Sequence, residues 1–266
     1  MDGLTVSILN FNGKEVLPEC IEAILNQEKP KEFELQIVDN ASTDGSEKEA
    51  FVKYPIDALI REKNEYQFIT GLNATFKYAK YENVLFVSND TILQDGAIMN
   101  LYNISQKFQP CIVQPVFLEQ SGKIQNAGMR MKWPGYGFAD KSAGEFDPVS
   151  ETEVFATGCF LMTRSIFKLV GRFDEELSPA FYEDVDYSLR AKRLGVKLLV
   201  DSSARVKHYT SYSFSKVYSK RDISKACHKN RVYVIKKHYR GLSMLTRVAV
   251  VNIIDMINHV IQLKYI

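Results

Sequence analysis

The chain has 266 residues, of which 45% are hydrophobic and 25% are charged, a composition typical of one globular unit of moderate size. Its four cysteines are widely separated and form no C-x-x-C pair, which argues against a disulfide framework or a zinc site. The net charge of +2 combines a segment of +9 from Tyr209 onward (eleven Lys or Arg, two acids) with a body of −7, a distribution that does not favour nucleic-acid binding.

The first half of the sequence alternates apolar runs with helical periodicity. Strands are predicted at residues 4–9, 35–38, 57–60 and 84–87, and helices at residues 15–27 and 68–78. This alternation predicts β-α-β units and an α/β fold with a mainly parallel sheet flanked by helices. Ligands bind beyond the carboxyl ends of such strands, where Asn10, Asp39 and Asp90 lie.

The second half is less regular. Its predicted strands lie at residues 112–115, 128–133, 155–163, 196–200 and 204–208, and a short helix is predicted at residues 165–170. Gly158 lies inside an apolar run, and a glycine within a strand often marks the close approach of a ligand or another backbone. His208 ends the last of these strands.

The acidic sequence Tyr182-Glu183-Asp184-Val185-Asp186 predicts the first turn of a helix that stops at Gly195. The helix dipole favours an ionised Asp184 there, and a carboxylate at a cleft edge can accept a proton from a substrate hydroxyl. An ordinary acidic helix start is the alternative interpretation. Asp186 and Arg190, four residues apart, are expected to pair on the exposed helix surface.

From residue 215 the chain is predicted to be helical and basic, with a break at Gly241. Residues 242–266 are amphipathic and too interrupted by polar groups to span a bilayer. Contact with a membrane surface is one interpretation of this pattern, and pairing in a homodimer or packing on the body are the others. On the first interpretation, removal of residues 242–266 would leave turnover intact.

Several motifs occur in a characteristic order along residues 4–237. They are VSILNFN at 6–12, IVDNASTDGS at 37–46, the segment 64–73, LFVSNDT at 85–91, GCFLM at 158–162, GRFDE at 171–175, YEDVD at 182–186 and His208. Together they resemble the family 2 glycosyltransferases of the GT-A fold, most closely the rhamnosyltransferase-like members.

The resemblance implies a GT-A domain at about residues 1–210, with a nucleotide-sugar half at 1–110 and an acceptor half at 111–210. Residues 211–266 would form a helical extension. The implied activity is transfer of a sugar, with inversion, from a nucleotide-diphosphate donor to a hydroxyl of a glycan or lipid-linked acceptor. Family members of this kind point to bacterial surface polysaccharide assembly.

The resemblance also assigns roles to single residues. Asp184 matches the general base, and Glu183 and Gly158 match the acceptor site. Asp90 and His208 match ligands of a divalent cation, Mg²⁺ or Mn²⁺, with Ser88 in the other acidic position of the family's D-x-D motif. The implied donor contacts are Asn10, Phe11, Asp39, Asn64, Asn73, Asn89 and Asp90. Only Gly71 remains of the glycine-rich run that the family has between Asn64 and Asn73.

Two other functions are compatible with parts of this pattern. A sugar-1-phosphate nucleotidyltransferase also uses an α/β nucleotide-binding sheet, but it needs a Gly-rich basic loop that residues 10–14 match poorly. A non-enzymatic membrane scaffold would use only the basic extension. No basic-then-apolar leader precedes the first strand, so we expect a cytoplasmic protein, with a peripheral location on the inner face of the plasma membrane as the alternative.

Overall fold

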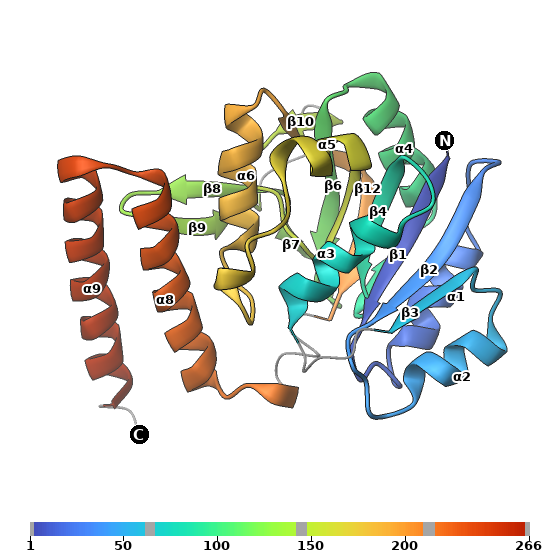
Figure 1. The fold of residues 1–266 in the computed structure, drawn as a ribbon, viewed down its shortest axis with the longest axis horizontal. Coiled ribbons are helices and arrows are strands. Elements are labelled where there is room, and N and C mark those ends of the chain that lie inside the picture. The colour runs from blue at the N-terminus through green and yellow to red at the C-terminus, as the bar shows by residue number, and fades with distance from the viewer. Residues whose placement is uncertain (1–2, 62–66, 142–147, 210–215, 264–266) are drawn as a thin grey trace.

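The fold is a three-layer α/β arrangement built around one mixed sheet (Figure 1). The computed structural model describes residues 3–61, 67–141, 148–209 and 216–263. Within these ranges a ten-stranded sheet has the order β10-β12-β6-β11-β4-β1-β2-β3, with β5 beside β12 and β7 beside β6, and β8 and β9 form a separate hairpin. The strands are β1 (Leu4–Asn10), β2 (Phe33–Asp39), β3 (Ala58–Arg61), β4 (Asn83–Ser88), β5 (Thr91–Leu93), β6 (Cys111–Leu118), β7 (Ile124–Asn126), β8 (Met129–Lys132), β9 (Tyr136–Ala139), β10 (Val149–Glu151), β11 (Cys159–Thr163) and β12 (Lys197–His208).

Strands β3, β2, β1 and β4 are mutually parallel, and β11 inserts antiparallel between β4 and β6. All seven residues of β1 are buried, because a central parallel strand is covered on both faces. The register pairs Asn10 with Asp39 and Leu9 with Ser88, so the carboxyl ends of β1, β2 and β4 meet at one edge. The predicted α/β fold with a mainly parallel sheet is confirmed.

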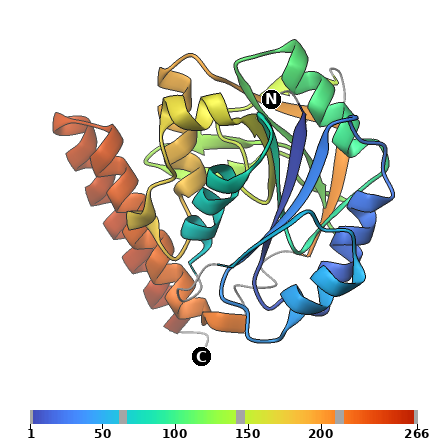
Figure 2. The ribbon, with the colours of Figure 1, turned by 45° about the vertical axis from the view of Figure 1, so that its right-hand side comes forward.

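Helices cover both faces of this sheet. They are α1 (Leu17–Leu25), α2 (Ser46–Lys53), α3 (Phe68–Tyr78), α4 (Ala97–Lys107), α5 (Arg164–Val170), α6 (Glu183–Arg193), α8 (Lys220–His238) and α9 (Gly241–Leu263), with a 3₁₀ turn at Glu175–Leu177. One buried core joins the sheet to α1, α2 and α4, and a second joins its other face to α3, α5 and α6. Figure 2 shows the two helical layers on opposite sides of the strands.

Several elements differ from the predicted ones. Strands β5, β7, β9 and β10 had no predicted counterpart, and three further differences have a clear physical reason. Helix α4 lies in a stretch with no predicted element, because its buried stripe is narrow and includes the polar Ser105. The apolar run 155–163 is a strand only from Cys159 onward, since a continuous apolar run does not distinguish a strand from a buried loop. The two strands predicted at 196–200 and 204–208 are one, β12, interrupted by a register shift between Asp201 and Arg205.

Helix α6 begins and ends as its sequence predicts. Gly195 has a φ of +77°, and the backbone N–H groups of Gly195 and Val196 donate to the carbonyls of Lys192 and Ala191, which caps the helix. On its buried side, the Tyr187 ring stacks on Phe173 with a centroid distance of 4.0 Å. The helix therefore has a fixed end and a fixed core face.

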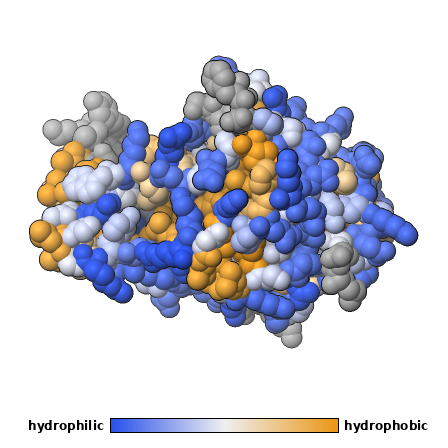
Figure 3. Space-filling model, turned by 90° about the horizontal axis from the view of Figure 1, so that it is seen from above, coloured by the Kyte–Doolittle hydropathy of each residue, from blue (hydrophilic) through white to orange (hydrophobic). Residues whose placement is uncertain are grey.

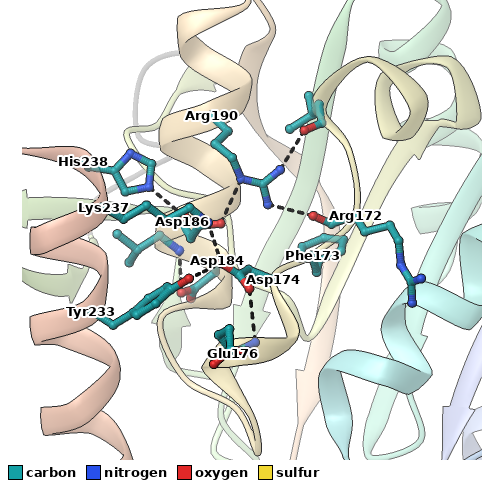
Figure 4. A network of polar contacts seen from close by, with 12 residues as sticks. Arg172, Phe173, Asp174, Glu176, Asp184, Asp186, Arg190, Tyr233, Lys237 and His238 are labelled. Carbon is teal, nitrogen blue, oxygen red and sulfur yellow. Dashed lines mark hydrogen bonds and ion pairs between the residues drawn. The ribbon is translucent and has the colours of Figure 1, made fainter.

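The sequence predicted that Asp186 and Arg190 pair on an exposed surface. They do pair, but the pair is buried. The Asp186 side chain is fully buried, and its carboxylate accepts hydrogen bonds from Arg190 Nε at 2.9 Å and His238 Nε2 at 2.7 Å and pairs with Lys237 Nζ at 2.8 Å (Figure 4). The prediction was wrong because Lys237 and His238 come from the end of α8, which helical spacing within α6 cannot reveal. Burial alone would raise the pKa of Asp186, but the His238 hydrogen bond and the Arg190 and Lys237 charges hold it well below its usual range.

The two C-terminal helices form an antiparallel pair at one end of the molecule (Figure 1). Asp255 of α9 faces α8 and binds Arg231, whereas Leu245, Ile253 and Met256 are exposed. The polar arc of α9 therefore packs inward and the apolar arc faces outward. Among the described residues, no helix has both the length and the apolar character that crossing a bilayer requires.

We expect Asp186→Asn to destabilise the fold. Breaking a buried ion pair by removing one partner costs about 3–5 kcal/mol, and the lower part of that range is expected because Arg190 and Lys237 remain 19% and 31% exposed. Urea denaturation at neutral pH measures the loss. Since the folded pKa of Asp186 is lowered, its stabilising contribution is present above the ordinary carboxyl pKa and disappears as the pH falls.

The difference in unfolding free energy between the wild type and Asp186→Asn should therefore shrink in acid. Glu49→Gln is the matched control, because Glu49 pairs with Lys14 on the surface, where ion pairs contribute roughly 0–1 kcal/mol. Equal stability of the two variants at neutral pH would show that the buried network contributes nothing.

Candidate active site

A cavity of about 500 Å³ opens at the carboxyl edge of the sheet, between the strand ends and α6. It brings together seven of the predicted site residues, which are Phe11, Asn89, Asp90, Gly158, Glu183, Asp184 and His208. Of the described residues that line the cavity, three are carboxylic acids and none is Lys or Arg. The described lining thus combines three carboxyl groups with the His208 imidazole and includes no permanently positive side chain.

Asn10 and Asp39 lie behind this cavity, in a fully buried polar cluster. The Asn10 amide donates to Asp39 Oδ1 at 3.0 Å and to Ser46 Oγ at 2.9 Å, and it accepts a hydrogen bond from Asn89 Nδ2 at 2.9 Å. Asp39 also accepts the backbone N–H of Ser42 at 3.0 Å. Asn10 therefore connects Asp39 to Asn89, which lines the cavity.

The strand-end pattern also identifies a residue that was not predicted, Arg61 at the end of β3. Its guanidinium pairs with Glu47 at 3.1 Å, lies 3.9 Å from Asp39 and donates to the carbonyl of Ser42 at 3.1 Å. Because β3 runs parallel to β2, Arg61 reaches the same edge as Asp39. Applying the strand-end rule to every strand would have found it.

Asp90 and His208 come together because β5 pairs with the end of β12, and the backbone N–H of Tyr209 donates to the Asp90 carbonyl at 3.0 Å. His208 Nε2 lies 3.5 Å from Asp90 Oδ1, and His208 Nδ1 lies 3.0 Å from Gln125 Oε1. When Nδ1–H donates to Gln125, Nε2 turns its lone pair toward Asp90, as in a metal-binding histidine with a fixed tautomer.

This pair supplies one carboxylate and one imidazole. No group of three or more His, Cys, Asp or Glu suited to a metal occurs within the described ranges. Mg²⁺ is commonly held by one or two carboxylates together with substrate phosphates rather than by a complete protein cage. The donors therefore fit a divalent cation that is bound jointly with a diphosphate.

Glu183 and Asp184 occupy the first turn of α6, at the cavity. The backbone before them is strained, since Phe181 and Tyr182 have φ values of 75° and 71°. Thr157 Oγ1 donates to Glu183 Oε1 at 2.8 Å, and the N–H of Val185 donates to Asp184 Oδ1 at 2.7 Å. Burial, with the neighbouring Glu183 charge, raises the pKa of Asp184 well above its usual range.

The predicted donor contact Asn73 does not line the cavity. The Asn73 amide is buried elsewhere and donates to the Phe173 carbonyl and Glu175 Oε1, both at 3.0 Å, while it accepts the N–H of Phe173 at 2.9 Å. Asn73 thus ties α3 to the segment before α6, which sequence spacing could not show because the partners lie about a hundred residues away. Asn64 lies outside the described residues.

The C-terminal extension contributes to the same cavity. Tyr182 and Cys227 line it, the second from α8, together with Gly137 of the β8–β9 hairpin. Cys227 was noted in the sequence only for its isolation, and no local pattern connects it with residues that precede α6. The extension is therefore part of the cavity wall.

Comparison with known proteins identifies the family and the fold of the chain. The sequence model of glycosyl transferase family 2 matches residues 5–171. Poly(ribitol-phosphate) beta-glucosyltransferase of Bacillus spizizenii is 28% identical over 120 residues, which are 40% of this chain and 18% of that protein. Staphylococcus aureus TarP, a poly(ribitol-phosphate) beta-N-acetylglucosaminyltransferase, is 31% identical over 112 residues, 40% of this chain and 34% of that protein. The chain thus spans less than two thirds of the length of these relatives.

Solved structures share the fold. GalNAc-T7 with UDP, GalNAc and Mn²⁺ superposes with a TM-score of 0.70 at 16% identity, over 89% of this chain and 48% of that chain. S. aureus TarS 1–349 with UDP superposes with a TM-score of 0.63 at 16% identity, over 94% of this chain and 70% of that chain. These likenesses confirm the GT-A fold, and because the family match covers more than half of the sequence, the chain belongs to glycosyl transferase family 2.

Proposed function

We propose that the protein is an inverting glycosyltransferase that moves a sugar from a nucleotide-diphosphate donor to an acceptor hydroxyl. The observation that carries the proposal is the meeting of two chemically different groups in one cavity. Asp184 is a half-buried carboxylate with a raised pKa, and Asp90 with His208 is a donor pair suited to a cation and a diphosphate. A nucleotidyltransferase or a scaffold would not need the first of these groups.

The donor would lie along the strand ends. The buried cluster of Asn10, Asp39 and Asn89 fixes the turns after β1 and β2, where a nucleoside can meet backbone groups and the Phe11 ring. A divalent cation held by Asp90 and His208 would neutralise negative charge on the leaving diphosphate. The described part of the cavity lining includes no Lys or Arg that would compensate this charge instead.

Asp184 would act on the acceptor as a general base. Its carboxylate takes the proton of the acceptor hydroxyl while the hydroxyl oxygen bonds to the anomeric carbon, and the bond from that carbon to the diphosphate oxygen breaks. A single displacement inverts the configuration of the anomeric carbon. A raised pKa suits this role, because a base works best when its pKa lies near the working pH. Thr157 would hold Glu183 beside the reacting hydroxyl.

The names of the relatives narrow the substrates to test. Both act on poly(ribitol-phosphate), one with glucose and one with N-acetylglucosamine. We therefore propose UDP-linked glucose or N-acetylglucosamine as donors and a hydroxyl of a polyol-phosphate polymer of a bacterial surface as the acceptor. The rhamnosyl preference stays a prediction, and a deoxythymidine-diphosphate rhamnose arm of the same panel tests it.

The base assignment predicts the behaviour of Asp184→Asn. With UDP sugars and poly(ribitol phosphate) as substrates, we expect the transfer rate to fall about 10²- to 10⁴-fold, because the amide cannot accept the proton. Donor affinity, measured by calorimetry, should barely change. Parallel loss of donor binding and rate would instead identify Asp184 as a donor or metal ligand.

Unfolding does not explain such a loss if the variant is at least as stable as the wild type. The folded pKa of Asp184 is raised, so ionising it costs stability as the pH rises above the ordinary carboxyl value, and the amide lacks this cost. We expect Asp184→Asn to unfold at a higher temperature than the wild type at pH 8. Asp95→Asn on the exposed surface is the control.

The metal assignment predicts that Asp90→Ala loses both divalent-cation dependence and most transfer, because Ser88 supplies no replacement charge. Stabilisation by Mn²⁺ in the presence of UDP, followed by thermal shift, measures binding without turnover. His208→Ala should be milder, since it leaves the carboxylate in place. Wild-type transfer and an unchanged Mn²⁺ response in Asp90→Ala would contradict the assignment.

We also propose that the outward face of α9 rests on an anionic membrane surface. Leu242, Leu245, Ile253, Met256 and Ile257 are exposed on α9, and Figure 3 shows apolar surface at the end of the molecule that this helix forms. Exposed Lys and Arg side chains on the neighbouring α8 would face lipid phosphates. Helix α9 would then act as the membrane-facing side of the enzyme.

Flotation with phosphatidylserine vesicles tests the membrane contact. The wild type should float, and the double variant Leu245→Asp, Ile253→Asp should not, because it puts two charges into the apolar face. Val52→Asp is the matched control, since Val52 is exposed on α2 at the far side of the molecule. If the wild type stays in solution as a dimer and the double variant is monomeric, the outward face of α9 binds a second copy of the chain and not a membrane.

A further inference from the structure

Behind the wall that α8 contributes to the cavity lies an arginine, Arg231, that is held by two tyrosines and a carboxylate. Arg231 lies one helical turn after Cys227, and its side chain is only 11% exposed. The guanidinium stacks on the Tyr136 ring at 3.8 Å from the centroid, lies 5.4 Å from the Tyr182 ring centre and donates from Nε to the Tyr182 hydroxyl. Tyr182 immediately precedes the two carboxylates of α6, so Arg231 fixes the residue next to Glu183 and Asp184.

Arg231 is itself held by α9. Its Nη1 lies 2.9 Å and 2.7 Å from the two carboxylate oxygens of Asp255, which also accept the Tyr136 hydroxyl at 3.0 Å and pair with His228 Nδ1 at 2.6 Å. Burial would raise the pKa of Asp255, but the His228 hydrogen bond and the Arg231 charge lower it. Asp255 is therefore an ionised anchor that joins α9 to α8 and to the β8–β9 hairpin.

We propose that α8 and α9 form part of the acceptor subsite, with Asp255 and Arg231 as positioning residues that hold Tyr182 and the Cys227 side of the wall in place. The contacts run without a gap from α9 through Arg231 to Tyr182, two residues before the candidate base. The inference rests on the proposed glycosyl transfer. It adds that the acceptor, and not the donor, is positioned by the C-terminal extension.

Ordinary packing of α8 on the body is a separate effect, and the chain offers a matched control for it. Asp174 anchors α8 on its other side, where it accepts hydrogen bonds from Tyr233 at 2.8 Å and Lys237 at 2.6 Å. Neither of these partners, nor Asp174, lines the cavity. Asp174→Asn therefore weakens the docking of α8 without touching the wall.

The structure also changes what removal of α9 should do. Deleting residues 242–266 would leave Arg231 without its carboxylate partner. It would also expose the surface that packs against Val251, which is fully buried in the intact chain. The expectation of intact turnover after this truncation is therefore withdrawn. Point variants separate the contribution of Asp255 from the loss of a whole helix.

The test compares Asp255→Asn and Arg231→Lys with Asp174→Asn in the full chain. Lysine keeps a charge for Asp255 but cannot stack between two rings and bond Tyr182 at once. With poly(ribitol phosphate) as acceptor, we expect a raised acceptor KM and a lower kcat in the first two variants, up to about 100-fold in kcat/KM. The donor KM and the slow hydrolysis of the donor should stay unchanged, and Asp174→Asn should change only the melting temperature.

A second measurement does not require turnover. Cys227 is partly exposed, whereas Cys20, Cys111 and Cys159 are buried, so the fast phase of labelling by a thiol reagent reports on the wall. It should accelerate in Asp255→Asn and Arg231→Lys and not in Asp174→Asn.

The outcomes separate the two proposals. This inference alone would be overturned if the wild type transfers sugar and both Asp255→Asn and Arg231→Lys keep an unchanged acceptor KM. It would also be overturned if the labelling and KM effects of these two variants equal those of Asp174→Asn. Absence of transfer by the wild type with every donor would overturn the proposed function, and with it the assignment of this wall to an acceptor.

Discussion

The position of the candidate base depends on one buried carboxylate two residues away from it. Asp186 is surrounded by Arg190 of its own helix and by Lys237 and His238 at the end of α8. Such a group is costly to bury unless its charge is matched and its hydrogen bonds are made, so the two cations and the His238 imidazole are required at that place once the carboxylate is there. Arg190 extends the same network to the carbonyls of Val170 and Arg172, which fixes α6 against the end of α5 as well (Figure 4).

Asp184 and Asp186 show how two carboxylates on one helix turn acquire opposite properties. Residues two apart in a helix point to nearly opposite sides. Asp186 therefore faces Lys237 and His238 of α8, and Asp184 faces the cavity, next to Glu183. The environment lowers the pKa of the first and raises that of the second. The stabilising carboxylate, Asp186, and the candidate base, Asp184, are thus two residues apart. The contacts of Asp186 fix the orientation of the helix turn from which Asp184 projects.

The sequence was sufficient for features that depend on local pattern. The alternation of apolar runs predicted the parallel sheet, and the strand-end rule predicted that Asn10, Asp39 and Asp90 share one edge of it. In the structure Asp90 lines the cavity at this edge, and Asn10 and Asp39 lie behind it. It was insufficient where a partner comes from a distant segment. Asn73 contacts Phe173 and Glu175 instead of the cavity, and Asp186 is buried by a helix that starts more than thirty residues later. Local periodicity contains no information about such contacts, because they are decided by which helix covers which face of the sheet.

The charge of the cavity limits how a donor can enter it. Asp90, Glu183 and Asp184 are all negative when ionised, and the described lining includes no Lys or Arg to offset them. Two unit charges 4 Å apart interact by about 4 kcal/mol at the effective dielectric of a protein surface, so a bare diphosphate would be strongly repelled. A diphosphate that arrives together with a divalent cation is close to neutral and avoids this repulsion. Burial, together with the Glu183 charge, raises the pKa of Asp184, and the carboxylates of the cavity favour a donor that binds as its metal complex. Electrostatics therefore connects the two halves of the proposed site.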